Sequence, residues 1–128
     1  METLEDRRLL AAPEFLPGVV TGDVERSDLT EPSGMIASRT NDGVLWTHND
    51  SGDGPNFYAM STSGADLGRY TLVGGESYDW EDMASGPGLL AGVEYLYAGN
   101  IGDSNGTVYV LRVAEPVVDA AQQTPAPK

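Results

Sequence analysis

The chain has 128 residues, and its 20 acidic and 7 basic side chains give it a net charge of −13. This charge excludes a general nucleic-acid binder and argues against docking on anionic lipid, because both need Lys and Arg. The absence of cysteine excludes a disulfide framework, a thiolate zinc site and a cysteine nucleophile. No apolar stretch approaches the roughly 20 residues of a membrane span. Sixteen glycines and eight prolines indicate a turn-rich, all-β protein.

The first residues, METLEDRRLLAAP, lack the long apolar core and basic start of an ordinary secretory signal. They resemble a short sorting motif of the LEPR-XLL type, found on exported bacterial surface proteins, with an aspartate in place of its usual proline. The matching residues are Leu4, Glu5, Arg7, Leu9 and Leu10. The resemblance implies an exported or cell-surface protein, and a frayed helical turn of a cytoplasmic protein is the alternative. We expect residues 1–13 to be a leader or a disordered N-terminus.

Two parts of the chain repeat each other. Residues 33–38 match residues 80–85, and residues 44–60 match residues 95–111. The matched pairs include Met35 and Asp82, Trp46 and Tyr97, Asn49 and Asn100, and Tyr58 and Tyr109. Each copy has the same order of small residues, an aromatic strand, an Asn/Asp/Gly turn and a second aromatic strand, which predicts a repeated supersecondary unit.

Each copy is predicted to be a meander of short strands separated by Gly, Asn and Asp turns. In the first copy, about residues 31–75, strands are expected near residues 35–38, 44–48, 57–61 and 68–73. In the second copy, about residues 78–115, strands are expected near residues 83–85, 95–98 and 108–113. No stretch shows sustained helical periodicity, so the predicted fold is all-β.

A four-stranded repeat of about 40 to 50 residues is typical of a β-propeller blade. Blades bury their faces against neighbouring blades, so two blades alone leave two apolar faces exposed. The chain is then either a fragment or a unit of which several copies assemble. We expect two four-stranded blades that complete a six-bladed ring by homo-oligomerisation, as a trimer.

The second copy has one predicted strand fewer than the first. Residues 14–24 (EFLPGVVTGDV) are expected to supply the missing outer strand. Residues 15–20 would pair with the strand at 108–113, either in the same chain or in the next chain of the ring. The predicted two-bladed unit therefore spans residues 14–116, and residues 117–128 are expected to be a disordered tail.

Four blocks carry a family resemblance. They are residues 31–37 (EPSGMIA), 45–53 (LWTHNDSGD), 79–84 (DWEDMA) and 95–104 (YLYAGNIGDS). They resemble the SGLA, DWED and GDIGDN blocks of a family of bacterial six-bladed propellers near the NHL-like and phytase-esterase-like propellers. Asn100 stands in place of the first Asp of GDIGDN, and Ser104 in place of its last Asn. The resemblance covers about residues 22–115 and implies a six-bladed fold with calcium as a ligand.

Acidic and amide side chains gather at the ends of the predicted strands. The candidate metal ligands are Glu81, Asp82, Asp50, Asp103, Asn49 and Asn100. Their oxygens suit Ca²⁺, which binds about six to eight hard oxygen ligands, and carboxylates on inner strands would converge on the axis of a ring. The alternative is that these residues make turns and cap backbone groups. That alternative is favoured for the two turns, whereas both roles stay open for Glu81 and Asp82.

Trp80, His48 and Asp79 are the candidate ligand-binding residues. Trp80 would stack on a ligand or wedge between blades, and packing is favoured because a large ring buries much area. His48 is the only histidine, and no G-x-S-x-G or other nucleophile motif accompanies it. No catalytic residue is therefore assigned.

The sequence predicts a self-assembling propeller scaffold or binding module, whose ligand would be a small molecule, a glycan or a protein at the mouth of the central channel. The alternative is a calcium-dependent hydrolase of the lactonase or phosphoesterase kind, with its site on the channel axis. Only Arg39, Arg69 and Arg112 are basic between residues 29 and 115, which argues against phosphate cleavage. Fold alone names no ligand.

Overall fold

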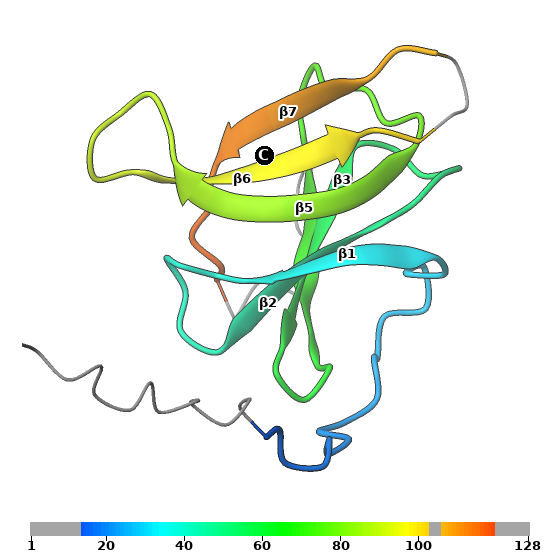
Figure 1. The fold of residues 1–128 in the computed structure, drawn as a ribbon, viewed down its shortest axis with the longest axis vertical. Helices are drawn as coiled ribbons and strands as arrows, with labels where there is room; N and C mark the ends of the chain where they lie inside the picture. Colours follow the sequence, from blue (N-terminus) through cyan, green and yellow to red (C-terminus); the bar gives the residue numbers. More distant parts are fainter. Residues whose placement is uncertain (1–13, 103–105, 120–128) are drawn as a thin grey trace, which may run out of the picture.

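The computed structural model describes residues 14–102 and 106–119, and all regular structure in this part of the chain is β-strand (Figure 1). The first antiparallel sheet contains β1 (Pro32–Ala37), β2 (Val44–Asn49), β3 (Asn56–Ser61) and β4 (Asp66–Thr71), in that order. The second contains β5 (Trp80–Pro87), β6 (Glu94–Asn100) and β7 (Tyr109–Ala114). The prediction of an all-β protein with these strands is confirmed.

A tight turn connects β3 and β4. Gly64 has a φ of 90° there, in the left-handed region that favours glycine. Its N–H donates to the carbonyl of Ser61 at 3.0 Å, and the Ser61 hydroxyl accepts from the N–H groups of Ser63 and Ala65. Because these hydrogen bonds join residues 61–65 to one another, this hairpin follows from local sequence.

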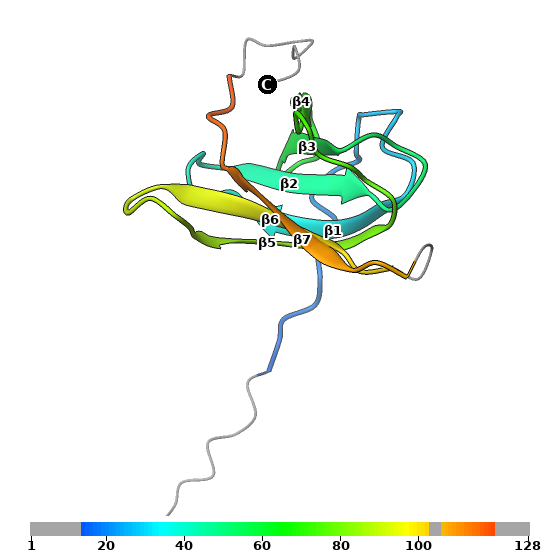
Figure 2. The same ribbon diagram turned by 90° about the horizontal axis from the view of Figure 1, so that it is seen from above.

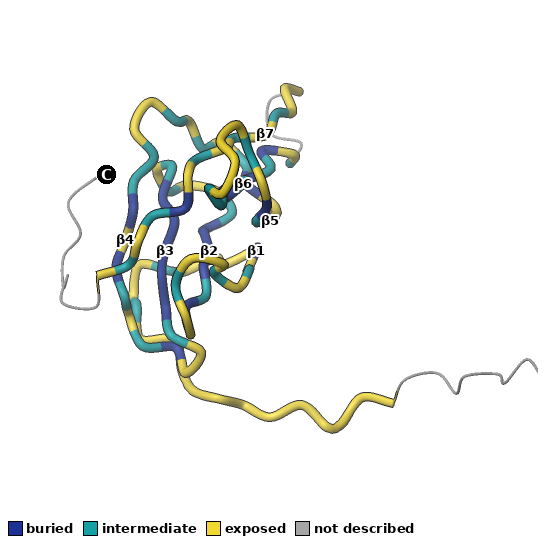
Figure 3. Tube along the Cα trace, turned by 90° about the vertical axis from the view of Figure 1, so that its left-hand side faces the viewer, coloured by how far each residue is buried: buried dark blue, intermediate teal, exposed yellow. Residues whose placement is uncertain are grey.

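Alternate residues of a strand point to opposite faces of its sheet. We call the face of the first sheet that carries Trp46 and Phe57 its front face, where the ladder pairs Trp46 with Ala59 and Phe57 with Tyr70. This front face packs on the second sheet, and Figure 3 shows the buried stretches along β2 and β3. The core consists of Val44, Trp46, Phe57, Ala59, Tyr70, Trp80, Met83, Leu96 and Ala98.

The two sheets meet at β1 and β5, which lie side by side and run in the same direction without joining into one sheet (Figures 1 and 2). The Ser33 hydroxyl donates to the carbonyl of Trp80 at 2.8 Å. A Cβ on Gly34 would lie 2.9 Å from the backbone nitrogen of Met83 and 2.6 Å from Nε2 of His48. Only glycine therefore permits this close approach of the two strands.

The ladders correct one detail of the internal repeat. Met35 pairs with Thr47, and Met83 pairs with Ala98. Because Thr47 and Ala98 are matched positions, Met35 corresponds to Met83. The match of Met35 with Asp82, predicted from the sequence, is therefore wrong by one residue. Each inner strand has a register shift near its start, and such shifts displace residues without leaving a local sequence signal.

Residues 21–31, which we call the N-terminal segment, run from the β3–β4 turn to the start of β1. The N–H of Glu25 donates to the carbonyl of Gly64 at 3.0 Å. The guanidinium of Arg26 lies over the ring of Tyr58, 5.1 Å from its centroid. Tyr58 belongs to the back face of the first sheet, opposite the core, and is only 2% exposed. The segment therefore covers part of this back face.

Residues 14–20 form no strand in this chain. They carry four apolar side chains that are between 82% and 93% exposed: Phe15, Leu16, Val19 and Val20. Figure 1 places this segment at the opposite end of the molecule from β7, which is the edge of a three-stranded sheet. The pairing of this segment with β7 in the same chain is therefore absent, because the chain is anchored beside the β3–β4 turn. Pairing with the next chain stays a prediction.

The segment after β7 turns back onto the first sheet. The side chain of Asn41 donates to the carbonyl of Pro116 at 3.0 Å and accepts from the N–H of Val118 at 2.8 Å. Val118 also packs against the core. The disordered tail predicted from residue 117 is therefore placed too early, because Val118 belongs to the fold. Residues 1–13 and 120–128 lie outside the described part of the chain.

Within the described ranges, no helix has the length and hydropathy needed to cross a bilayer.

Candidate functional site

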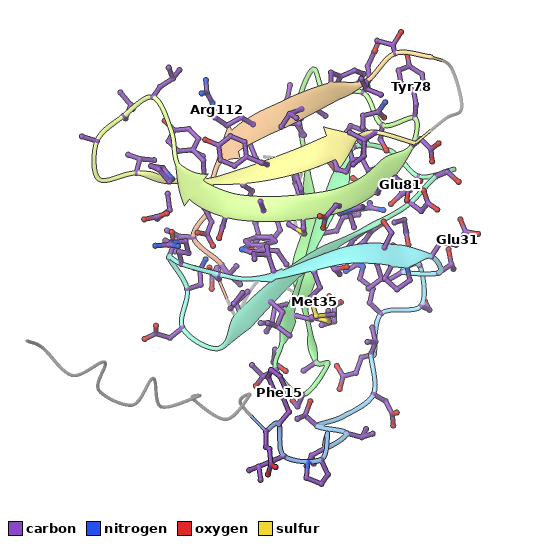
Figure 4. The ribbon with its side chains drawn as sticks, in the orientation of Figure 1. Phe15, Glu31, Met35, Tyr78, Glu81 and Arg112 are labelled. Carbon is purple, nitrogen blue, oxygen red and sulfur yellow. The ribbon has the colours of Figure 1, made fainter. Side chains whose placement is uncertain are left out.

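Three carboxylates meet at one end of the seam between the sheets. Asp50 follows β2, Asp79 precedes β5 and Glu81 is the second residue of β5. One side-chain oxygen from each lies within 4.8 Å of the others. The N–H of Asp50 donates to the carbonyl of Glu31, and the N–H of Trp80 donates to the carbonyl of Asp50, each at 2.9 Å. Figure 4 shows Glu31 and Glu81 at this end of β1 and β5.

The electrostatics of the cluster favour a bound positive charge. Oδ1 of Asp50 is buried and has no hydrogen-bond partner among the described residues. Burial, a side-chain hydrogen bond with Asp79 and the negative charge of Glu81 together raise the pKa of Asp50. Hard carboxylate oxygens suit Ca²⁺, but three side chains supply only part of its six to eight or so ligands. Water, carbonyl groups or a neighbouring chain would have to supply the others.

Asn49 and Asn100 have the same role, one in each sheet. Oδ1 of Asn49 accepts from the N–H of Glu31 at 3.0 Å. Oδ1 of Asn100 accepts from the N–H groups of Tyr78 and Asp79 at 3.1 and 2.9 Å. Each amide thus ties the end of a second strand to the backbone just before a first strand. These oxygens are engaged in the framework, which supports the capping alternative over metal ligation for both residues.

The turn after β2 is built around the carboxylate of Asp53. It accepts hydrogen bonds from the amides of Asn49 and Asn56, the hydroxyl of Tyr58 and the N–H of Gly54. Burial alone would raise the pKa of Asp53, but these four hydrogen bonds outweigh it and lower the pKa. The turn is therefore satisfied by its own residues.

The remaining predicted ligands lie apart from the cluster or outside the described residues. Asp82 is exposed, and its Oδ1 accepts from the N–H of Met83 at 2.8 Å. Asp103 lies in the segment that the structure does not describe. The cluster thus joins two predicted metal ligands, Asp50 and Glu81, to Asp79, which the sequence singled out only as a ligand-binding residue. A register shift at the start of β5 changes which of its acidic residues faces Asp50, and this shift cannot be read from the sequence.

His48 and Trp80 both lie inside the protein. Each is 0% exposed, and their rings meet edge to face with centroids 5.7 Å apart. Trp80 also contacts the ring of Phe57, and its Nε1 donates to the carbonyl of Glu76 at 3.2 Å. Nδ1 of His48 lies 3.0 Å from the carbonyl of Asn49. These contacts favour packing over ligand stacking, because neither ring presents surface to a ligand.

One buried acid had no predicted role. Glu115, 8% exposed, follows β7 and accepts hydrogen bonds from Trp46 Nε1 at 2.8 Å, from the hydroxyls of Ser38 and Thr40, and from the N–H of Arg39. Burial alone would raise the pKa of Glu115, but these donors lower it. An acid after an apolar strand is too common a pattern to reveal this contact in advance.

A small apolar pocket lies between the two sheets, where β4 and β7 end. Its volume is about 180 Å³. It is lined by Phe57, Tyr70, Thr71, Leu72, Val113, Ala114 and Pro116. No carboxylate of the acidic cluster lines it, so the pocket and the cluster are separate features.

Comparison of the chain with protein-family models, with curated proteins and with solved structures finds no match. The propeller resemblance therefore rests on the four sequence blocks alone.

Proposed function

We propose that this chain is a two-bladed propeller unit that assembles head to tail with copies of itself, three copies closing a six-bladed ring. The packing of its two sheets carries the proposal. The front face of the first sheet covers the second sheet, with β1 and β5 parallel at the seam. The corresponding front face of the second sheet is not covered in this way within the described residues. A further copy can cover this face with the back face of its first sheet and the N-terminal segment that lies across it.

The uncovered face belongs to β5, β6 and β7. Arg112 pairs with Tyr97 on this face, and Val110, on the same side of β7, is 65% exposed. Tyr97 matches Trp46 in the repeat, and Trp46 is fully buried by the second sheet. The equivalent contact with another copy would bury Tyr97 and Val110, and the removal of apolar surface from water favours such association.

The counterpart is the back face of the first sheet, with the N-terminal segment across it. Met35 is 54% exposed there. The segment adds the exposed acidic residues Asp23 and Glu25, which complement the positive charge of Arg112. Because the two contacting faces differ, the contact is head to tail. Such a contact closes a ring when the rotation from one copy to the next is a whole fraction of 360°.

The ring would act as a scaffold or binding module. Its inner strands, β1 and β5 of each copy, would surround the central channel, and the cluster of Asp50, Asp79 and Glu81 would recur around one mouth. Repeated carboxylates create a strongly negative potential that concentrates cations. We propose that this mouth binds Ca²⁺ and receives a small molecule, a glycan or a protein.

The native mass tests the assembly. Light scattering at micromolar concentration is expected to give three times the chain mass, and Val110→Glu is expected to give the monomer by placing a charge in the interface. Val73→Glu is the matched control, because Val73 is 77% exposed in the connection after β4. A monomeric wild type, or an unchanged mass for Val110→Glu, would overturn the proposal.

A second candidate function is calcium-dependent hydrolysis, which the carboxylate cluster and the raised pKa of Asp50 favour. In that case lactone or phosphoester turnover requires Ca²⁺ and is lost in Glu81→Gln, while the native mass stays unchanged. Glu81 is exposed and is suited to this test because its replacement leaves the core intact. Turnover that is indifferent to Glu81→Gln would remove this candidate and leave the scaffold.

A further inference from the structure

We propose that residues 14–20 of one copy pair with β7 of the next copy and complete its second sheet as a fourth strand. This inference rests on the proposed ring and names the segment that joins its members. Two features carry it: within residues 14–102 and 106–119, the second sheet has an open edge, and the extended apolar segment 14–20 has no strand partner.

The open edge is the outer side of β7. The first sheet has β4 outside β3, whereas the second sheet ends at β7, which matches β3 in the repeat. The N–H of Glu115 donates to the carbonyl of Glu94 on the β6 side. Because backbone direction alternates, the N–H and carbonyl groups of Val110 and Arg112 point away from β6. Such an edge accepts an added strand through main-chain hydrogen bonds.

The incoming strand is the segment EFLPGVV. Its four large apolar side chains are the most exposed on the described chain, with Phe15 at 93% and Val20 at 87%. Monomeric proteins seldom leave a contiguous apolar segment in water, so this exposure indicates a partner. The two adjacent valines favour a strand, and Pro17 is tolerated because the segment would form the outermost strand of its sheet.

The geometry points to a different chain as the acceptor. Thr21 Oγ1 donates to the carbonyl of Thr62 at 2.7 Å, which anchors the segment at the β3–β4 turn, at the outer part of the first sheet. In the head-to-tail contact, the second sheet of a neighbouring copy lies against the back face of this sheet. The vacant fourth-strand position of the neighbouring copy then lies next to β4 of this chain. Residues 14–20 of this chain leave the fold at the same place. The chain's own β7 is at the far end of the molecule (Figure 1).

Amide hydrogen exchange tests the strand directly, whatever its register. In the full chain at assembling concentration, the amides of Val110 and Arg112 are expected to exchange at least about tenfold more slowly than in the double variant Val19→Pro, Val20→Pro, which removes two consecutive donors. Glu14→Pro is the matched control and is expected to keep the protection. Dilution is expected to remove the protection, because the donor belongs to another copy.

Mixing provides a second measurement. The chain has no cysteine, so Val20→Cys and Arg112→Cys can be placed in separate chains, mixed and oxidised. A disulfide-linked pair is expected, and Glu14→Cys mixed with Asp42→Cys is expected to give none.

The outcomes separate the two proposals. A trimer whose Val110 amide exchanges equally fast in the full chain and in the double-proline variant overturns strand donation and leaves the ring. Protection that persists at dilution also overturns it. Protected amides and cross-linked pairs in an assembly other than a trimer uphold strand donation and overturn the six-bladed ring. A monomer with fast exchange overturns both.

Discussion

The carboxylate of Glu115, at the end of the second sheet, accepts a hydrogen bond from the indole Nε1 of Trp46, in the second strand of the first sheet, at 2.8 Å. The residues are 69 positions apart in the chain. The same carboxylate accepts three further hydrogen bonds from the β1–β2 turn. This single acid therefore fastens the end of one sheet to the start of the other.

Replacing Glu115 is expected to destabilise the protein. In Glu115→Gln, the amide group faces donors that it cannot satisfy, and a buried hydrogen bond to a charged group contributes about 1.5–3 kcal/mol. Urea unfolding is expected to show a loss of that order in the free energy of unfolding. Asp42→Asn, an exposed change in the same turn, is expected to change it by less than about 0.5 kcal/mol. Equal effects of the two variants would contradict the role of Glu115.

The lowered pKa of Glu115 predicts how stability depends on pH. Its folded-state pKa lies below the ordinary 4.5, so its contribution is complete above that pH and is lost as the pH falls through the folded-state pKa. The stability difference between wild type and Glu115→Gln is therefore expected to shrink below about pH 4.5. Urea midpoints measured from pH 7 to pH 3 check this, and a difference that stays constant contradicts it.

Gly34→Ala is expected to push the two sheets apart. The added Cβ would lie 2.9 Å from the backbone nitrogen of Met83, and backbone cannot yield as a flexible side chain does. Overpacking of this kind costs about 1–3 kcal/mol. Gly86→Ala is the control in β5, because a Cβ there meets nothing within 4 Å. Thermal unfolding of both variants decides whether the seam needs glycine.

Trp80→Ala is expected to unfold the protein or nearly so. The ring is 0% exposed at the junction of the sheets, and large-to-small changes at such sites cost about 3–5 kcal/mol. Tyr78→Ala, two residues earlier and 46% exposed, is expected to cost far less. Circular dichroism with urea compares them, and a Trp80→Ala protein as stable as Tyr78→Ala would contradict the packing role of Trp80.

Asp50→Asn is expected to raise the thermal midpoint at pH 7 in the absence of calcium. The pKa of Asp50 is raised above 3.8 in the fold, so its ionisation on going to neutral pH lowers stability. If the cluster binds Ca²⁺, millimolar Ca²⁺ raises the midpoint of the wild type and leaves that of Asp50→Asn unchanged. Asp42→Asn, outside the cluster, is expected to respond as the wild type does.

The candidate site was only partly accessible from sequence. The block around residues 79–82 pointed to acidic chemistry, but the choice between Asp79 and Asp82 depends on a register shift in β5. Asn49 and Asn100 matched in the repeat because both brace the backbone, and the same amide pattern also resembled a set of metal ligands. Amide oxygens serve both purposes, so only their hydrogen bonds distinguish the two roles.

The sequence by itself determined the strands, the turns and the duplication, because alternation and turn chemistry act over a few neighbouring residues. Tertiary structure alone decided which faces meet and which acids come together. The contact of Glu115 with Trp46, the passage of β5 over Gly34 and the grouping of Asp50 with Glu81 join residues far apart in the chain. Such contacts depend on how two sheets pack as bodies, and no local pattern of residue types encodes that arrangement.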